Sequence, residues 1–190
     1  NTIDELKKTP KEYGVELDLR DYGNKLILQH DPFIGGEDFE EYLKFYNHGT
    51  MILNIKSERI EYKVLELIKK YHIRNYFFLD CSFPMIYLLS NAGEKKIALR
   101  FSEFEGTDTI LKMKSKVDWI WVDCFTKLPI NKKNYTYLKN CGFKFCLVSP
   151  ELQAKNEKIE EYKKYLDKEG IFFDAICTKR ININRWKIIG

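Results

Sequence analysis

The chain is best interpreted from one stretch, Gly14-Val15-Glu16-Leu17-Asp18-Leu19-Arg20, which is followed by Gln29-His30-Asp31-Pro32. A β-strand points successive side chains to opposite faces, so Glu16 and Asp18 project together and the apolar residues cover the other face. Two carboxylates one pleat apart form half of a site for a hard divalent cation, because Ca²⁺ and Mg²⁺ prefer oxygen ligands and need negative charge. His30 adds a group that exchanges protons near neutral pH.

A structural role for the same strand stays open. Strands with one apolar and one acidic face also occur in β/α barrels without binding a metal. The His-Asp-Pro sequence that begins at His30 favours the metal interpretation, because it brings proton-transfer chemistry next to the carboxylates.

These residues resemble a known family. Members of the glycerophosphodiester phosphodiesterase family, and of the wider group of barrel phosphodiesterases that includes the phosphatidylinositol-specific phospholipases C, carry His-Arg-Gly, Glu-Asn-Thr, Glu-x-Asp and His-Asp in this order. Asn1-Thr2, Glu16 with Asp18, and His30-Asp31 resemble the last three in order and spacing. The family's first His-Arg pair would lie upstream of Asn1. The resemblance implies a barrel phosphodiesterase with a divalent cation, Mg²⁺ or Ca²⁺, as its cofactor.

Length and composition predict a single domain over residues 1–190. Of the 190 residues, 44% are hydrophobic, which is enough for a sizeable core. An eight-fold barrel typically needs about 250 residues, so this one would be compact. The 32 basic and 28 acidic residues give a net charge of only +4, so the chain does not carry the basic surface expected of a nucleic-acid-binding protein.

No apolar run is long enough for a membrane-spanning helix, and the first segment, Ile3–Lys11, lacks the apolar centre of a signal peptide. Five cysteines without a Cys-x-x-Cys pattern favour buried thiols over disulfides or a zinc site. We therefore expect a soluble protein of the cytoplasm, a reducing compartment. His48 and His72 are expected to be structural.

Short apolar segments alternate with amphipathic ones along the chain, which predicts a parallel sheet with helical crossovers. The expected strands are Tyr13–Leu19, Met51–Ile55, Tyr76–Leu79, Ile97–Phe101, Trp119–Val122, Phe143–Val148 and Phe172–Cys177. The expected helices are Asp38–Tyr46, Glu58–Tyr71, Pro84–Ser90, Gly106–Met113, Lys132–Lys139 and Glu157–Lys168.

Polar residues end nearly every expected strand, and a closed barrel would gather these ends into one mouth. We therefore predict an α/β fold of the TIM-type (β/α)8 barrel class, with its first strand missing or replaced. Two explanations stay open for that position. In the first, the apolar C-terminal run Arg185–Gly190 pairs between the strands at Tyr13 and Phe172. In the second, an upstream strand precedes Asn1.

Asn54-Ile55-Lys56 resembles the family's third-strand Glu-x-Lys. Asn54 stands where a carboxylate ligand is usual, and its amide oxygen can coordinate a cation but brings no charge. Lys56 is predicted to contact a substrate phosphate, with a solvent-exposed lysine as the alternative.

Arg100 ends its strand and needs a partner, which would be a substrate phosphate or an acidic residue such as Asp80 or Asp123. Trp121 is predicted to form an apolar wall against the substrate or to fill the barrel interior.

Two functions of different classes stay open. The first is a metal-assisted phosphodiester hydrolase of the glycerophosphodiester phosphodiesterase type, in which His30 is the general acid or base. Its substrate would be a small phosphodiester or a glycerophosphate-bearing glycan. The second is a non-catalytic barrel that binds a phosphorylated glycan or a protein partner, which the absent His-Arg pair and the uncharged Asn54 favour. The sequence does not indicate the oligomeric state.

Overall fold

The computed structural model describes residues 1–187 and divides the chain into two compact units. The first unit covers Asn1–Ile97 and the second begins at Ala98. Each unit is described by itself, and the expectation of a single domain over 1–190 stays a prediction.

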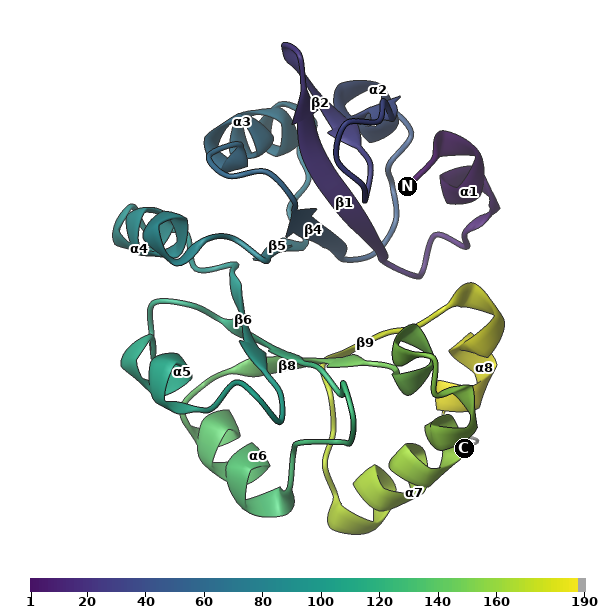
Figure 1. Ribbon diagram of the computed structural model, residues 1–190, viewed down its shortest axis with the longest axis vertical. Helices are drawn as coiled ribbons and strands as arrows, with labels where there is room; N and C mark the ends of the chain where they lie inside the picture. Colours follow the sequence, from purple (N-terminus) through teal and green to yellow (C-terminus); the bar gives the residue numbers. More distant parts are fainter. Residues whose placement is uncertain (188–190) are drawn as a thin grey trace. The chain divides into compact units, whose positions relative to one another are not determined.

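The first unit is built on a mixed sheet of five strands in the order β3-β2-β1-β4-β5 (Figure 1). These strands are β1 Val15–Tyr22, β2 Lys25–Leu28, β3 Glu37–Asp38, β4 Met51–Ile55 and β5 Tyr76–Leu79. The parallel register aligns Leu17 with Leu53 and Leu53 with Phe78, and all three side chains are buried. These residues form an apolar row on one face at the centre of the sheet. The next row of the register, on the opposite face, aligns Asp18 with Asn54.

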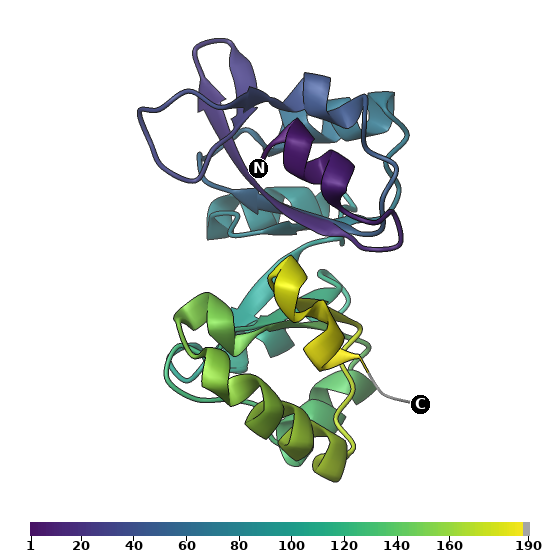
Figure 2. The same ribbon diagram turned by 90° about the vertical axis from the view of Figure 1, so that its right-hand side faces the viewer.

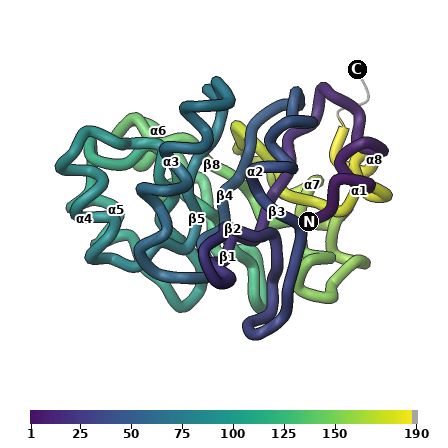
Figure 3. The backbone as a smooth tube through the Cα atoms, turned by 90° about the horizontal axis from the view of Figure 1, so that it is seen from above, coloured from purple at the N-terminus to yellow at the C-terminus, as the bar shows by residue number. Residues whose placement is uncertain are grey.

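The antiparallel hairpin of β1 and β2 was not predicted (Figure 3). Its two-residue loop consists of Gly23 and Asn24, and Gly23 has a φ of 59°, which glycine adopts without steric cost. A Gly-Asn pair between apolar runs is typical of such hairpins, so the signal was present in the sequence. The hairpin matters for the fold because β2 pairs with residues 19–22 of β1, on the edge of β1 that faces away from β4.

Four α-helices belong to the first unit: α1 Ile3–Lys8, α2 Phe39–Leu43, α3 Glu61–Lys70 and α4 Phe83–Asn91. Helices α2 and α3 lie on the same side of the sheet (Figure 1) and contribute the fully buried Phe39 and Val64. Polar caps explain where two of the helices begin. The Thr2 hydroxyl accepts a hydrogen bond at the start of α1, and the Asp38 carboxylate does the same at the start of α2.

The second unit is built on a parallel sheet of four strands in the order β6-β7-β8-β9. Its strands are β6 Ala98–Phe101, β7 Trp119–Val122, β8 Lys144–Val148 and β9 Ala175–Cys177. The α-helices are α5 Asp108–Lys112, α6 Lys132–Asn140, α7 Ile159–Glu169 and α8 Ile183–Trp186, and the short 3₁₀ helices are η1 Pro150–Gln153, η2 Asn156–Lys158 and η3 Arg180–Asn182.

Helices α5, α6 and α7 all lie on the same side of this sheet (Figure 1). The ring of Tyr135 in α6 packs against Phe145 of β8 with the ring centroids 5.3 Å apart. Phe145 therefore marks the helix-covered face, and its register partner Ile120 shares that face. Arg100 and Trp121 lie on the opposite face, because they are displaced by one residue along their strands.

The prediction of a TIM-type (β/α)8 barrel is wrong. Residues 1–187 form two separate sheets, and no closed barrel is found among them. In the first unit, the segment after β5 adds only one isolated parallel bridge, between Phe78 and Ile97. The barrel was inferred from polar residues at the ends of many strands, but any parallel sheet gathers such residues at one edge. That observation therefore did not discriminate between one closed sheet and two open ones.

Pairing of the C-terminal run, one of the two explanations for the first strand position, is wrong for the described residues of that run. Arg185 and Trp186 belong to α8 and not to a strand, and α8 lies beside α7 (Figure 2). The remainder of the run, residues 188–190, lies outside the described residues. Cys81, Cys124 and Cys146 are buried, as predicted, whereas Cys141 and Cys177 are partly exposed.

Candidate functional site

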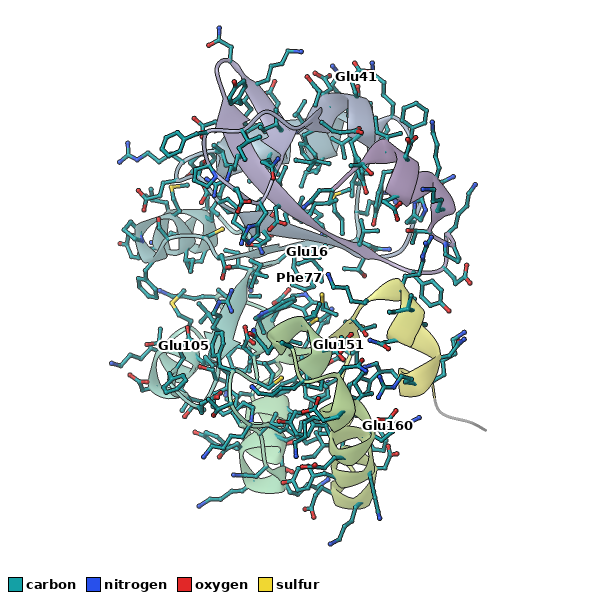
Figure 4. The ribbon with its side chains drawn as sticks, turned by 45° about the vertical axis from the view of Figure 1, so that its right-hand side comes forward. Glu16, Glu41, Phe77, Glu105, Glu151 and Glu160 are labelled. Atoms are coloured by element: carbon teal, nitrogen blue, oxygen red, sulfur yellow. The ribbon has the colours of Figure 1, made fainter. Side chains whose placement is uncertain are left out.

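The candidate site lies in the first unit, on the first half of β1 and at the C-terminal end of β4. Parallel pairing places Asp18 directly beside Asn54. Glu16 lies one pleat earlier on the same face of β1, and Figure 4 labels it. The structure therefore brings together the three side chains that the sequence predicted as cation ligands.

Asn54 connects the two strands. Its amide nitrogen Nδ2 donates a hydrogen bond to Glu16 Oε1 at 2.8 Å. Its other polar atom, the carbonyl oxygen Oδ1, is buried and has no hydrogen-bond partner among the described residues. A buried acceptor without a partner is costly, so a group that supplies positive charge or a donor at this point would stabilise the site.

The electrostatics of Glu16 indicate the same need. Burial raises the pKa of its carboxyl group above the ordinary value, and the negative charge of Asp18 raises it further. The hydrogen bond from Asn54 and the charge of Lys56 act in the opposite direction but do not cancel the rise. A cation bound at this point would favour the ionised form of Glu16 and lower this pKa again.

Asp18 is held by two partners. Asn1 Nδ2 donates to Asp18 Oδ2 at 2.8 Å, and the backbone nitrogen of Asp18 donates to Asn1 Oδ1 at 2.9 Å. The Lys56 ammonium lies 3.4 Å from Asp18 Oδ1 and 4.0 Å from Asp80 Oδ2, and it is mostly buried. Lys56 thus contacts the carboxylates of the site instead of extending into solvent.

His30 lies in the loop that follows β2, next to the candidate site. The backbone nitrogen of Gln29 donates to the carbonyl oxygen of Asp18 at 2.9 Å, which ties the beginning of the loop to β1. The His30 imidazole is exposed, and its Nδ1 lies 2.8 Å from Asp31 Oδ1. This contact leaves Nε2 as the nitrogen that can give or take a proton.

Arg20 fixes the backbone of that loop, a role that the sequence reasoning missed. Its Nε and Nη2 donate to the carbonyl oxygen of His30 at 3.1 and 2.8 Å, and its Nη1 donates to the carbonyl oxygen of Lys56 at 3.1 Å. One guanidinium therefore joins β1, the His30 loop and the end of β4. The alternation of Glu16, Asp18 and Arg20 along the strand was a usable signal, because all three share a face.

These side chains fit a hard divalent cation, because Glu16, Asp18 and the unpartnered Asn54 oxygen are all oxygen donors. Among residues 1–187, no three His, Cys, Asp or Glu side chains are grouped closely enough to hold a metal ion. Any cation here would therefore use the amide oxygen of Asn54 in addition to the carboxylates.

A second buried acid, Glu61, was not predicted. It opens α3, where an acidic residue usually faces solvent, yet it is 0% exposed. The Cys81 thiol and the backbone nitrogens of Glu61 and Arg59 face its carboxylate and act to lower its pKa. Burial raises the pKa of Glu61. The pKa of the Cys81 thiol is also raised, by the burial of Cys81 and by the charge of Glu61.

We expect Glu61→Gln to make the protein more stable at pH 8 and to leave its stability nearly unchanged at acidic pH. Because the pKa of Glu61 is raised in the folded state, the folded protein binds more protons than the unfolded chain, and stability falls as pH rises above about 4.5. Glutamine removes this proton linkage and keeps the shape of the side chain. Urea unfolding between about pH 4.5 and 8 measures the effect. An equal slope of stability against pH in both proteins would contradict the prediction.

The polar strand ends of the second unit satisfy one another. Arg100 Nη1 lies 2.5 Å from Asp123 Oδ2, and Asp123 Oδ1 accepts from Gln153 Nε2 at 3.0 Å. Glu151, labelled in Figure 4, accepts hydrogen bonds from the hydroxyls of Ser149 and Thr178. Arg100 therefore has the acidic partner that the sequence analysis allowed as one of two possibilities.

Trp121 is buried, with 5% of its surface exposed, on the same face as Arg100. Both residues belong to the second unit, whereas the predicted cation ligands, Lys56 and His30 belong to the first.

Of the two remaining histidines, His48 bonds through Nε2 to the carbonyl oxygen of Thr9 at 3.0 Å, and the exposed His72 follows the end of α3 with a φ of 57°.

No described helix has the length and apolar character needed to cross a membrane. No protein-family model matches the chain, and no curated protein matches it.

Proposed function

We propose that the chain is a metal-assisted phosphodiester hydrolase of the glycerophosphodiester phosphodiesterase type, with its site on the first half of β1 and at the C-terminal end of β4. One observation carries the proposal: Glu16, Asp18 and the unpartnered oxygen of Asn54 lie together on one face of two adjacent parallel strands. This arrangement does not depend on a closed barrel, because it is formed within the first unit.

Each residue has a role that follows from its chemistry. A divalent cation, when bound, polarises the phosphoryl group and offsets the charge of the carboxylates. Lys56 is positioned to share the negative charge of a phosphate oxygen, since its ammonium already lies among the carboxylates of the site. His30 gives a proton to the leaving alkoxide or takes one from the nucleophile. Arg100 has no catalytic role in this proposal, because it is paired with Asp123.

We expect Mg²⁺, Ca²⁺ or Mn²⁺ to raise the melting temperature of the wild-type protein, and Glu16→Gln with Asp18→Asn to abolish that rise. A ligand that binds only the folded state stabilises it by about 2.7 kcal/mol at about 100 times its Kd. The matched control is Glu66→Gln, which removes the charge of an exposed carboxylate on α3 and should respond like the wild type. A wild-type protein that no millimolar divalent cation stabilises would exclude the cation site.

Hydrolysis is tested on a soluble diester, glycerophosphocholine, by measuring the release of glycerol 3-phosphate or choline with and without each cation. Cation-dependent turnover supports the proposal. Absence of turnover with all three cations, in a protein that they stabilise, contradicts it.

The second candidate is a non-catalytic protein that binds a phosphorylated glycan or a protein partner. It is favoured by the contact of Lys56 with Asp18, because a built-in ammonium supplies positive charge next to these carboxylates. Calorimetry distinguishes the two functions. Binding of glycerol 3-phosphate without any cation, together with no hydrolysis of the diester, is the result expected of the second candidate.

A further inference from the structure

The loop that joins β2 to β3, residues 29–36, is closed at its base by specific contacts. Gln29 Nε2 donates to the carbonyl oxygen of Gly35 at 3.2 Å, and the backbone nitrogen of Asp31 donates to Gln29 Oε1 at 3.3 Å. Gly36 approaches the chain so closely that a Cβ there would lie 2.3 Å from the carbonyl oxygen of Leu28. The base therefore holds the tip of the loop in a defined position.

The tip carries two large apolar side chains into solvent. Phe33 is 98% exposed and Ile34 is 54% exposed. Phe33 also has a φ of 64°, a backbone conformation that residues other than glycine, asparagine and aspartate rarely adopt. An aromatic side chain that is almost fully exposed on a strained backbone gains nothing from the fold that surrounds it. Phe33 and the adjacent Ile34 together form a small exposed apolar surface at the tip of a loop whose base is held by hydrogen bonds.

We propose that Phe33 and Ile34 form an anchor that inserts into the surface of a phospholipid bilayer. The area of the tip decides between a bilayer and a protein partner. A phenylalanine and an isoleucine together bury a few hundred Å², whereas a stable protein interface buries about 800 Å² on each partner. A bilayer accepts single side chains at the boundary between headgroups and acyl chains, so two residues are sufficient there.

The charges that flank the tip select the kind of lipid. Asp31, Glu37 and Asp38 lie at or next to the ends of the loop. Asp31 contacts His30 Nδ1 at 2.8 Å, and Asp38 pairs with Lys25 at 3.0 Å. These acidic side chains are repelled by an anionic membrane surface. The free energy of membrane binding must therefore come from insertion of the apolar side chains. The anchor is therefore expected to prefer vesicles of uncharged phosphatidylcholine.

The anchor also bears on the substrate. His30 precedes Phe33 by three residues, so insertion of the tip brings the imidazole to the lipid surface. This inference about the substrate, unlike the anchor itself, rests on the proposed hydrolase function. With that function, the site takes phosphodiesters presented at a bilayer as well as soluble ones.

The test is sedimentation of the protein with large unilamellar vesicles of phosphatidylcholine. We expect the wild type to sediment with them and the variant Phe33→Asn with Ile34→Ser to partition about 10²-fold more weakly. Asparagine tolerates the positive φ at position 33, so this variant retains the loop conformation. The matched control is Phe104→Asn with Ile181→Ser, which removes an exposed phenylalanine and isoleucine from the second unit and should bind like the wild type.

Three results would overturn the anchor: no sedimentation of the wild type, equal partitioning of the loop variant, or binding that requires anionic phosphatidylserine. Light scattering that shows a dimer lost in the loop variant would also overturn it, because the tip would then contact a second copy. Hydrolysis of glycerophosphocholine without vesicles separates the two proposals. Vesicle binding without hydrolysis supports the anchor and contradicts the proposed function. Hydrolysis without vesicle binding supports the proposed function and contradicts the anchor.

Discussion

Replacing Asp123 with alanine should destabilise the second unit by about 3 kcal/mol. The Asp123 carboxylate is almost completely buried and accepts hydrogen bonds from Arg100, Gln153 and the backbone nitrogen of Cys124. Removal of the Asp123 carboxylate takes away the ion-pair partner of Arg100. It also takes away the acceptor of Gln153 Nε2 and of the Cys124 backbone nitrogen. We place the loss at the lower end of the range for broken buried ion pairs, because the Arg100 side chain retains 27% exposure.

Urea unfolding followed by tryptophan fluorescence measures this effect directly. All three tryptophans lie beyond residue 97, and two of them are in β7, immediately before Asp123. The control is the double variant Arg100→Met with Asp123→Leu, which removes both charges and should recover much of the lost stability. A midpoint for Asp123→Ala within error of the wild type would show that the pair is dispensable.

Replacing His30 with alanine should lower kcat on a phosphodiester by at least about 10²-fold and change KM little, because an acid-base group acts in the transition state more than in substrate binding. The Asp31 carboxylate next to Nδ1 orients the ring, so Asp31→Asn should cause a smaller loss of the same kind. Both effects are measured on glycerophosphocholine at saturating cation.

The control for this prediction is His72→Asn. His72 is exposed at the end of α3 with a positive φ that asparagine also adopts, so the variant should retain wild-type turnover. The wild type should also show a pH dependence of kcat that His30→Ala lacks. Turnover of His30→Ala above a tenth of the wild-type value would remove His30 from the chemistry.

Local structure was predictable where the pattern of apolar residues decides it. The bounds of β4, β5 and β7 agree with the expected strands Met51–Ile55, Tyr76–Leu79 and Trp119–Val122, because each is a short apolar run. The hairpin strands β2 and β3 were missed. β2 has only four residues, β3 has two, and both depend on pairing with a neighbour for their stability.

The candidate site was predictable in part for the same reason. Alternation along β1 places Glu16 and Asp18 on one face, and pairing with the next parallel strand brings Asn54 to them. The hydrogen bonds from Asn1 and Arg20 were not foreseen, since they join residues 17 and 10 positions apart through side chains. Glu61 offered no signal, because its sequence context is that of an ordinary first-turn acid.

The sequence by itself determined the alternation of helices and strands from α2 to β9 and the acidic face of β1, because both follow from the spacing of apolar residues along a few neighbouring positions. Only the tertiary structure decided that the strands form two sheets, that Glu61 is buried, and that the described residues give the buried Asn54 oxygen no hydrogen-bond partner. Closure of a sheet depends on hydrogen bonds between strands far apart in the chain. Burial depends on what packs around a side chain, and neither is encoded in local periodicity.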